Sequence, residues 1–154
     1  MRKLSTHTAI GIAKWFVAWA EHIDAEVSNL KVQKLLYYAQ GHYLAETGRP
    51  LFKDTIQAWA HGPVVPAVYH ELKEYGSAPV DPDRFLGSEF DWDAYVDVDK
   101  SLLKVWDKYG SFAAWALREK THREPPWKTA FDEESRNSKI STEEMAEFFA
   151  SGRV

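Results

Sequence analysis

The chain has 154 residues, 45% of them hydrophobic and 14% aromatic, so it holds ample material for a folded core and is too apolar to stay disordered. It has no cysteine, which excludes a disulfide framework, thiol catalysis and a cysteine-ligated zinc site. Its net charge of -4 argues against a general nucleic-acid binder. No stretch approaches the ~20 apolar residues that span a bilayer, so we expect a cytoplasmic protein, with residues 1–154 forming one domain.

Apolar side chains that recur every three or four residues predict the first two helices. In the first, from about Thr8 to His22, this spacing is shared by Ile12, Trp15, Phe16, Trp19 and Ile23. In the second, which Ser28 or Asn29 can cap and Gly48 ends, it is shared by Val32, Leu35, Leu36, Ala39 and Tyr43. Because Tyr37, Tyr38 and His42 widen this face, the second helix either lies at the centre of the fold or exposes aromatic surface.

Glycine and proline punctuate the middle of the chain. Alternation from Ile56 to Trp59 allows a short strand, which a turn at residues 61–63 ends. Pro63 and Pro66 suit the first turn of a third helix, because proline lacks the amide hydrogen that such positions leave unpaired, and Gly76 stops that helix. Residues 77–91 hold two prolines and one glycine and are typical of a loop.

The C-terminal half predicts further helices. One runs to about Tyr109, and the next is capped by Ser111, with Phe112, Trp115 and Ala116 facing inward. A Pro125–Pro126 pair then breaks the chain. Residues 141–144 form a capping box, in which a serine oxygen accepts a free amide hydrogen, so a last helix is expected over 141–151. The patterns predict a mainly α, compact single-domain bundle of about six or seven helices, with room for a small β-strand pair.

Acidic side chains are concentrated between Asp81 and Asp99. This segment holds seven Asp or Glu residues and Arg84 as its single base. One interpretation is a solvated loop and helix start. The other is an acidic patch that meets a basic partner, such as an RNA-binding toxin.

No linear motif for catalysis or metal binding stands out. The run from His70 to Glu74 is like the zinc-protease helix His-Glu-x-x-His, but glutamate replaces the second histidine, so we expect no metal and no cofactor. No nucleophile elbow and no phosphate-binding glycine loop are present, so we do not expect an enzyme. His61 and His122 are open to two interpretations. They meet in the fold as an acid/base pair, or, as we favour, each ring fixes a turn through a backbone hydrogen bond.

Rare aromatic, glycine and proline residues follow a specific order in two blocks. The first block is made of Gln33–Gly41, Gly48, Pro50–Phe52, Ala58–Trp59, Gly62–Pro66 and Tyr69, and the second is Thr121–Trp127. Over roughly residues 8–131 the chain resembles the SocA-like, or Panacea, antitoxin domain, a family that includes phage-associated GepA-like proteins. The resemblance implies an antitoxin that neutralises a cognate protein toxin by direct contact. At least one such domain is an adaptor that delivers its toxin to a cellular protease.

The resemblance also implies where a partner binds, namely around the second helix and the turn at Gly62. The expected contact residues are Gln33, Lys34, Tyr37, Tyr38, Trp59, His61, Gly62, Pro63, Tyr69, His122 and Glu124. By helical position alone, Lys34 is expected to be an ordinary surface residue. A protease adaptor, a phage-associated regulatory protein and a small hydrolase remain alternatives. Direct nucleic-acid binding is not expected, because about fifteen residues separate the second and third helices, too many for a helix-turn-helix.

Overall fold

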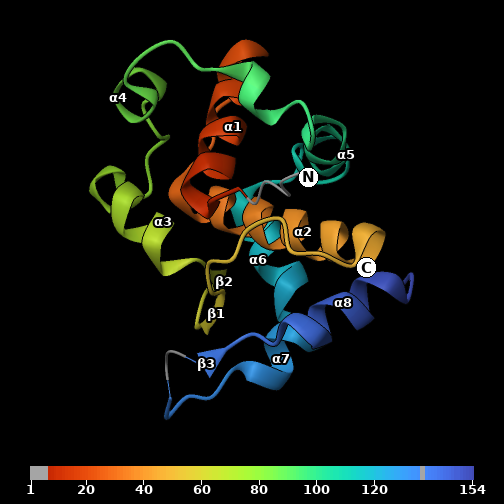
Figure 1. The fold of residues 1–154 in the computed structure, drawn as a ribbon. Coiled ribbons are helices and arrows are strands. Elements are labelled where there is room, and N and C mark those ends of the chain that lie inside the picture. The colour runs from red at the N-terminus through yellow and green to blue at the C-terminus, as the bar shows by residue number, and fades with distance from the viewer. Residues whose placement is uncertain (1–6, 136–137) are drawn as a thin grey trace.

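A computed structural model describes residues 7–135 and 138–154 (Figure 1). These residues form the α-helices α1 (Ala9–His22), α2 (Asn29–Thr47), α3 (Pro66–Leu72), α4 (Pro82–Leu86), α5 (Asp99–Tyr109), α6 (Ala114–His122), α7 (Pro125–Ala130) and α8 (Thr142–Ala150). Two 3-10 helices, Lys73–Tyr75 and Trp92–Tyr95, and three strands, β1 (Gln57–Trp59), β2 (Gly62–Val64) and β3 (Ser138–Lys139), accompany them. The predicted mainly α fold with a small strand pair is confirmed.

Helix α1 begins and ends at the predicted residues. The Thr8 hydroxyl accepts a hydrogen bond from the amide of Gly11 at 3.1 Å, which satisfies one of the free amides of the first turn. Ile12 and Phe16 are buried, as their spacing predicts. Ile23 is 42% exposed, so its assignment to the buried face was wrong. The helical conformation has already ended there, and Asp24 follows with a φ of 57°.

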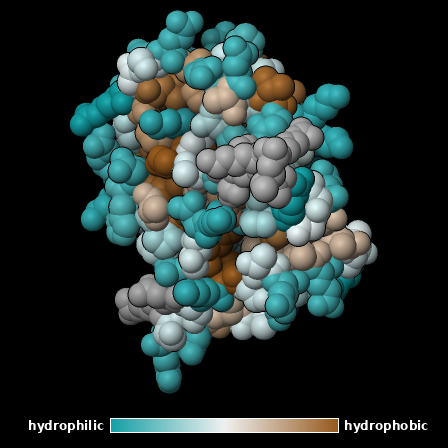
Figure 2. All heavy atoms as spheres, viewed as in Figure 1, coloured by the Kyte–Doolittle hydropathy of each residue, from teal (hydrophilic) through white to brown (hydrophobic). Residues whose placement is uncertain are grey.

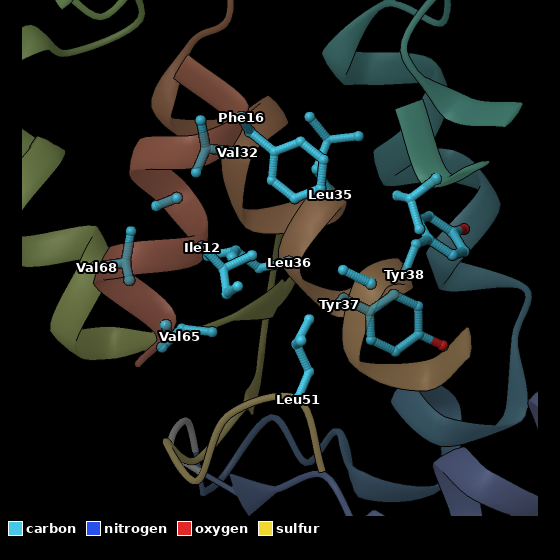
Figure 3. Close-up of a cluster of buried hydrophobic side chains, with 14 of the residues drawn as sticks. Ile12, Phe16, Val32, Leu35, Leu36, Tyr37, Tyr38, Leu51, Val65 and Val68 are labelled. Carbon is cyan, nitrogen blue, oxygen red and sulfur yellow. The ribbon is translucent and has the colours of Figure 1, made fainter. Parts of the chain in front are cut away.

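Helix α2 lies at the centre of the fold, which settles the choice left open by its broad apolar face. It packs against α1, α3, α5, α6, α8 and β2, and Figure 1 shows it crossing the middle of the molecule with the other helices around it. All residues from Val32 to Gly41 are buried. In Figure 3, Leu36 lies close to Ile12 of α1, while Tyr37 and Tyr38 point to the other side of the helix.

The C-terminal helix α8 crosses α2 at a glycine. A Cβ atom on Gly41 would lie 2.2 Å from a ring carbon of Phe149, so no larger residue fits unless that ring shifts. At the start of α8, the Ser141 hydroxyl accepts a hydrogen bond from the Glu144 amide at 3.2 Å, as the capping box predicts. Ile140 and Met145 are both buried beside it.

The strands form a small antiparallel sheet in the order β2-β1-β3. Ala58 pairs with Pro63 in the β1–β2 hairpin and with Ser138 in β3. Pro63 therefore belongs to a strand, and the prediction that it opens a helix was wrong. Proline is tolerated there because β2 is an edge strand, where a missing amide hydrogen costs no ladder bond. Pro66 is the residue that opens α3.

Three further boundaries differ from the prediction. The segment expected to be a loop contains α4, which Asp81 caps through its carboxylate and Pro82 opens. The break between α6 and α7 falls at Arg123 and Glu124, and the Pro125–Pro126 pair opens the short helix α7, because the first helical positions need no amide hydrogen. Helix α6 begins at Ala114 rather than after Ser111.

The surface seen in Figure 2 is mostly hydrophilic, with hydrophobic side chains in small separate patches. Of the seven acidic residues between 81 and 99, only Asp99 is partly buried and the other six are exposed. Their expected role in meeting a basic partner stays a prediction. Among the described residues, none of the helices has the length and apolar character needed to cross a membrane.

Candidate functional site

The Gly62 turn is held against α2 by the side chain of Gln33. The Gln33 oxygen accepts a hydrogen bond from the Val65 amide at 2.8 Å, and its amide nitrogen donates to the Asn29 side chain at 2.9 Å, one helical turn away. The Asn29 amide in turn donates to the carbonyl of Tyr69 at 3.4 Å. Gln33 is 1% exposed. This buried chain of amides therefore fixes where β2 ends and α3 begins.

Lys34, the next residue of α2, reaches the same turn from inside the protein. Its side chain is fully buried, so the expectation of a surface lysine was wrong. The amine donates a hydrogen bond to the carbonyl oxygen of Pro63 at 3.0 Å. Burial, and after it the charge of Arg118, lowers the pKa of Lys34 to about 7. Burying a charged amine costs free energy, which favours the neutral form of Lys34. Its hydrogen bond to Pro63 joins two segments that are 29 residues apart in the sequence.

Gly62 lets the turn approach this lysine. Its φ is 110°, a conformation that side chains rarely adopt. A Cβ atom at this position would lie 2.6 Å from Cε of Lys34 and 3.0 Å from the hydroxyl of Thr121 in α6. The turn, α2 and α6 thus meet at one point that only glycine can occupy.

A second buried polar cluster surrounds the carboxylate of Glu124, just before α7. It accepts hydrogen bonds from the hydroxyls of Tyr37 and Tyr38, each at 3.1 Å, and forms an ion pair with Lys120 at 3.3 Å. Burial raises the pKa of Glu124 against the opposing charge of Lys120. The Tyr38 ring also stacks on Tyr109 of α5 with the ring centroids 3.9 Å apart. The cluster joins α2 to α5 and to the start of α7.

His61 and His122 lie near one another, and each is part of an aromatic group. The His122 ring stacks on Trp127 at 4.1 Å, and the indole N–H of Trp127 donates to the carbonyl of Trp59 at 2.8 Å. The His61 ring stacks on Tyr69 at 6.2 Å. Burial lowers the pKa of both histidines, with Lys34 next in importance for His61 and Arg118 for His122. Both rings therefore favour the neutral form.

One nitrogen of each of these rings is without a hydrogen-bond partner among the described residues: Nδ1 of His61 and Nε2 of His122. The backbone of Ala60 in the hairpin turn opposes the lowering of the pKa of His122. Such an interaction fits the interpretation in which this histidine fixes the hairpin turn. Within residues 7–135 and 138–154, no group of three or more acidic or histidine side chains is arranged to hold a metal ion.

A cavity of about 320 Å³ opens beside His61. We name it the α2–α6 cavity, and its walls include Asn29 and Gln33 of α2, His61, Tyr69 of α3, Lys73 and Arg118 of α6. Arg118 forms an exposed ion pair with its neighbour Glu119 at 3.0 Å. The cavity is the place where predicted site residues reach a concave part of the surface.

The structure brings the predicted site residues to one junction but buries most of them. Seven are in the interior, namely Gln33, Lys34, Tyr37, Tyr38, Gly62, Pro63 and Glu124. Four are partly exposed, namely Trp59, His61, Tyr69 and His122. The buried seven hold the junction in place, and the four others lie at its surface. Whether any of them contacts a partner stays a prediction.

Residues outside the sequence prediction complete this surface. Arg118 lies four residues before His122 on α6, so the same helical spacing places both on one face. Phe112 and Trp115, which we predicted to be inward, are 46% and 70% exposed, so that prediction was wrong. The α6 residues that are buried are Leu117 and Thr121. The sequence did contain a pattern that places these residues together. Trp115, Arg118 and His122 are spaced three and four residues apart, which puts them on one face of a helix.

Comparison with known proteins agrees with the motifs that build this junction. The family described as "Antitoxin SocA-like, Panacea domain" matches residues 32–128, well over half of the chain. Antitoxin SocA of Caulobacter vibrioides (strain NA1000 / CB15N) is 44% identical over 61 residues, which are 40% of this chain and 32% of that protein. The match thus spans about a third of that relative's length. No solved structure matches the chain. The chain belongs to the SocA-like Panacea domain family.

Proposed function

We propose that this protein is an antitoxin that binds a cognate protein toxin directly and silences it within a stable complex. Membership of the Panacea family and the likeness to Antitoxin SocA support the antitoxin role. The finer statements, that binding is direct and that the toxin is a protein, rest on the arrangement of the site.

One observation carries the proposal: the polar groups of the family motifs form hydrogen bonds inside the protein. The amide of Gln33, the amine of Lys34 and the carboxylate of Glu124 are buried and engaged in bonds inside the protein. Groups engaged in this way are not free to act on a substrate. They hold the hairpin, α2 and α6 in a fixed arrangement, and a surface fixed before binding loses less entropy when a partner docks.

The residue types on this surface are those that anchor protein interfaces. Trp59, Tyr69 and Arg118 are partly exposed, and Trp115 is 70% exposed. Tryptophan, tyrosine and arginine are enriched among residues whose truncation weakens binding most. A complex that covered roughly 800 Å² of this face would have the size of a stable interface.

Co-expression tests the proposal. Each protein encoded beside this gene is produced with and without it, and growth, complex formation and toxin level are measured. We expect restored growth together with a stoichiometric complex. A toxin level that stays constant indicates occlusion, whereas a level that falls only when a cellular protease is present indicates delivery for degradation.

Two results would contradict the proposal. One is restored growth without any complex between the two proteins. The other is turnover of a substrate by the purified protein that is lost when either His61 or His122 is replaced, since that would assign the two rings to chemistry.

A further inference from the structure

The α2–α6 cavity is positively charged in a protein whose net charge is -4. Arg118 and Lys73 line it, and Lys34 lies behind it close enough to lower the pKa of His61. The described residues that form its wall include no Asp or Glu. The carboxylate of Glu119 meets Arg118 on the outside, in a pair whose side chains are 39% and 54% exposed. Such exposed pairs contribute little, and a guanidinium keeps further N–H groups for another acceptor.

The start of α2 adds to this field. Asn29 and Leu30, the first two residues of this 19-residue helix, form part of the cavity wall. The first turn of a helix carries a partial positive charge, although here the Lys31 amide already donates to the Ser28 hydroxyl at 3.2 Å. Helix polarity and side-chain charge therefore favour the same kind of ligand, an anion.

The remaining walls limit the size and shape of that ligand. Leu30 and Tyr69 present apolar surface, and His61 completes this part of the wall. A volume of about 320 Å³ is at the small end of ligand cavities and suits one side chain better than a cofactor.

We infer that the α2–α6 cavity receives the carboxylate side chain of an Asp or Glu from the protein that this chain binds, with Arg118 as its principal partner. Carboxylates match the planar fork of arginine, which can donate two parallel hydrogen bonds to them. The apolar walls accommodate the methylene part of the side chain. The inference rests on the proposed function for the source of the carboxylate, whereas the anion preference follows from the cavity alone.

Charge reversal tests the inference in the complex. Arg118→Glu is compared with Arg84→Glu, a control at an exposed arginine of α4 that pairs with Glu74. We expect Arg118→Glu to weaken binding of the co-expressed toxin by about 30-fold or more, and Arg84→Glu by less than about threefold. An Asp→Arg or Glu→Arg change on the toxin that restores binding to Arg118→Glu would identify the inserted side chain.

Melting curves accompany both variants, and the milder Arg118→Gln is measured as well. If Arg118→Glu does not fold, Arg118→Gln tests the inference instead. We expect this variant to bind the toxin more weakly at an unchanged melting temperature. Wild-type affinity in a folded Arg118 variant overturns the inference and leaves the proposed function standing. Capture of no protein by the wild type sinks the proposed function itself.

A second measurement needs no toxin. Two probes are titrated into the wild-type protein at millimolar concentrations, and the His61 ring resonances are followed by NMR. The acid is the α-methylamide of N-acetylglutamate, whose only charge is its side-chain carboxylate, and the amide is the neutral α-methylamide of N-acetylglutamine. We expect saturable shifts with the acid, none with the amide, and loss of the shifts in Arg118→Gln. Equal shifts with both probes, or none with the acid, would show that the cavity does not select carboxylates.

Discussion

The amine of Lys34 and the carbonyl oxygen of Pro63 are hydrogen-bonded at 3.0 Å in the interior of the protein. This bond ties the central helix to the edge strand of the hairpin, and it does so with a group whose charged form is poorly solvated there. The folded protein therefore releases the proton of Lys34 more readily than the unfolded chain does, because burial lowers its pKa to about 7 from the ordinary value of 10.5.

Stability should rise with pH because of this difference. Between about pH 7 and 10.5 the unfolded chain binds the Lys34 proton more tightly than the folded protein, so raising the pH favours folding. We expect the free energy of unfolding to gain up to about 1.4 kcal/mol per pH unit from Lys34 over this window. Urea unfolding at pH 7 and pH 9.5 measures it. Lys34→Met should remove this increment, and parallel pH profiles in wild type and variant would refute it.

Gly62 should tolerate substitution far less than another glycine with positive φ. In Gly62→Ala the new methyl group must share space with Cε of Lys34 in a conformation at φ 110°, so we expect a loss of about 3 kcal/mol or more in unfolding free energy. Gly48, which ends α2 at φ 73°, has open space around it. Gly48→Ala should cost about 1 kcal/mol. Equal losses in the two variants would mean that the Lys34 contact does not restrict the turn.

The carboxylate of Glu124 should matter to stability as the acceptor for two buried hydroxyls. Glu124→Ala leaves the hydroxyls of Tyr37 and Tyr38 without their acceptor, so we expect a loss of about 2–4 kcal/mol in unfolding free energy. Glu147→Ala, at an exposed position of α8, is the matched control and should change it by less than about 0.5 kcal/mol. Adding Tyr37→Phe should recover part of the loss, since one unpaired hydroxyl is then removed.

The sequence predicts the scaffold of this site better than its surface. The helix caps at Ser28 and Ser141 and the bounds of α1 follow from local spacing and from side chains close in sequence, whereas the central position of α2 was one of two alternatives. The burial of Lys34 does not, because its partner is a carbonyl 29 residues away. Strand β3 is missed for the same reason, since Ser138 pairs with Ala58.

The buried side of helix α6 was predicted wrongly because the helix is short. It has nine residues, so few repeats are available to decide which side is buried, and large aromatic residues bias the choice. The helix begins at Ala114, and the side that faces α2 carries Leu117 and Thr121 instead of Phe112 and Trp115. No linear motif includes Arg118, so the sequence does not predict it as a site residue. It lines the α2–α6 cavity, whose walls come from segments that are distant in the sequence.

Two substitutions on α6 separate folding from binding. Leu117 is fully buried, so Leu117→Ser should lower the free energy of unfolding by about 3 kcal/mol or more through lost packing and a buried hydroxyl. Trp115 is 70% exposed, so Trp115→Ser should change the free energy of unfolding by less than about 0.5 kcal/mol.

If this face of α6 binds the toxin, Trp115→Ser should weaken the complex by at least about 2 kcal/mol, as truncation of an aromatic anchor does. Urea unfolding and calorimetric titration of the co-expressed toxin measure the two effects. Full toxin affinity in a folded Trp115→Ser protein would show that Trp115 is not an anchor of the interface, because truncation of an anchor residue weakens binding measurably.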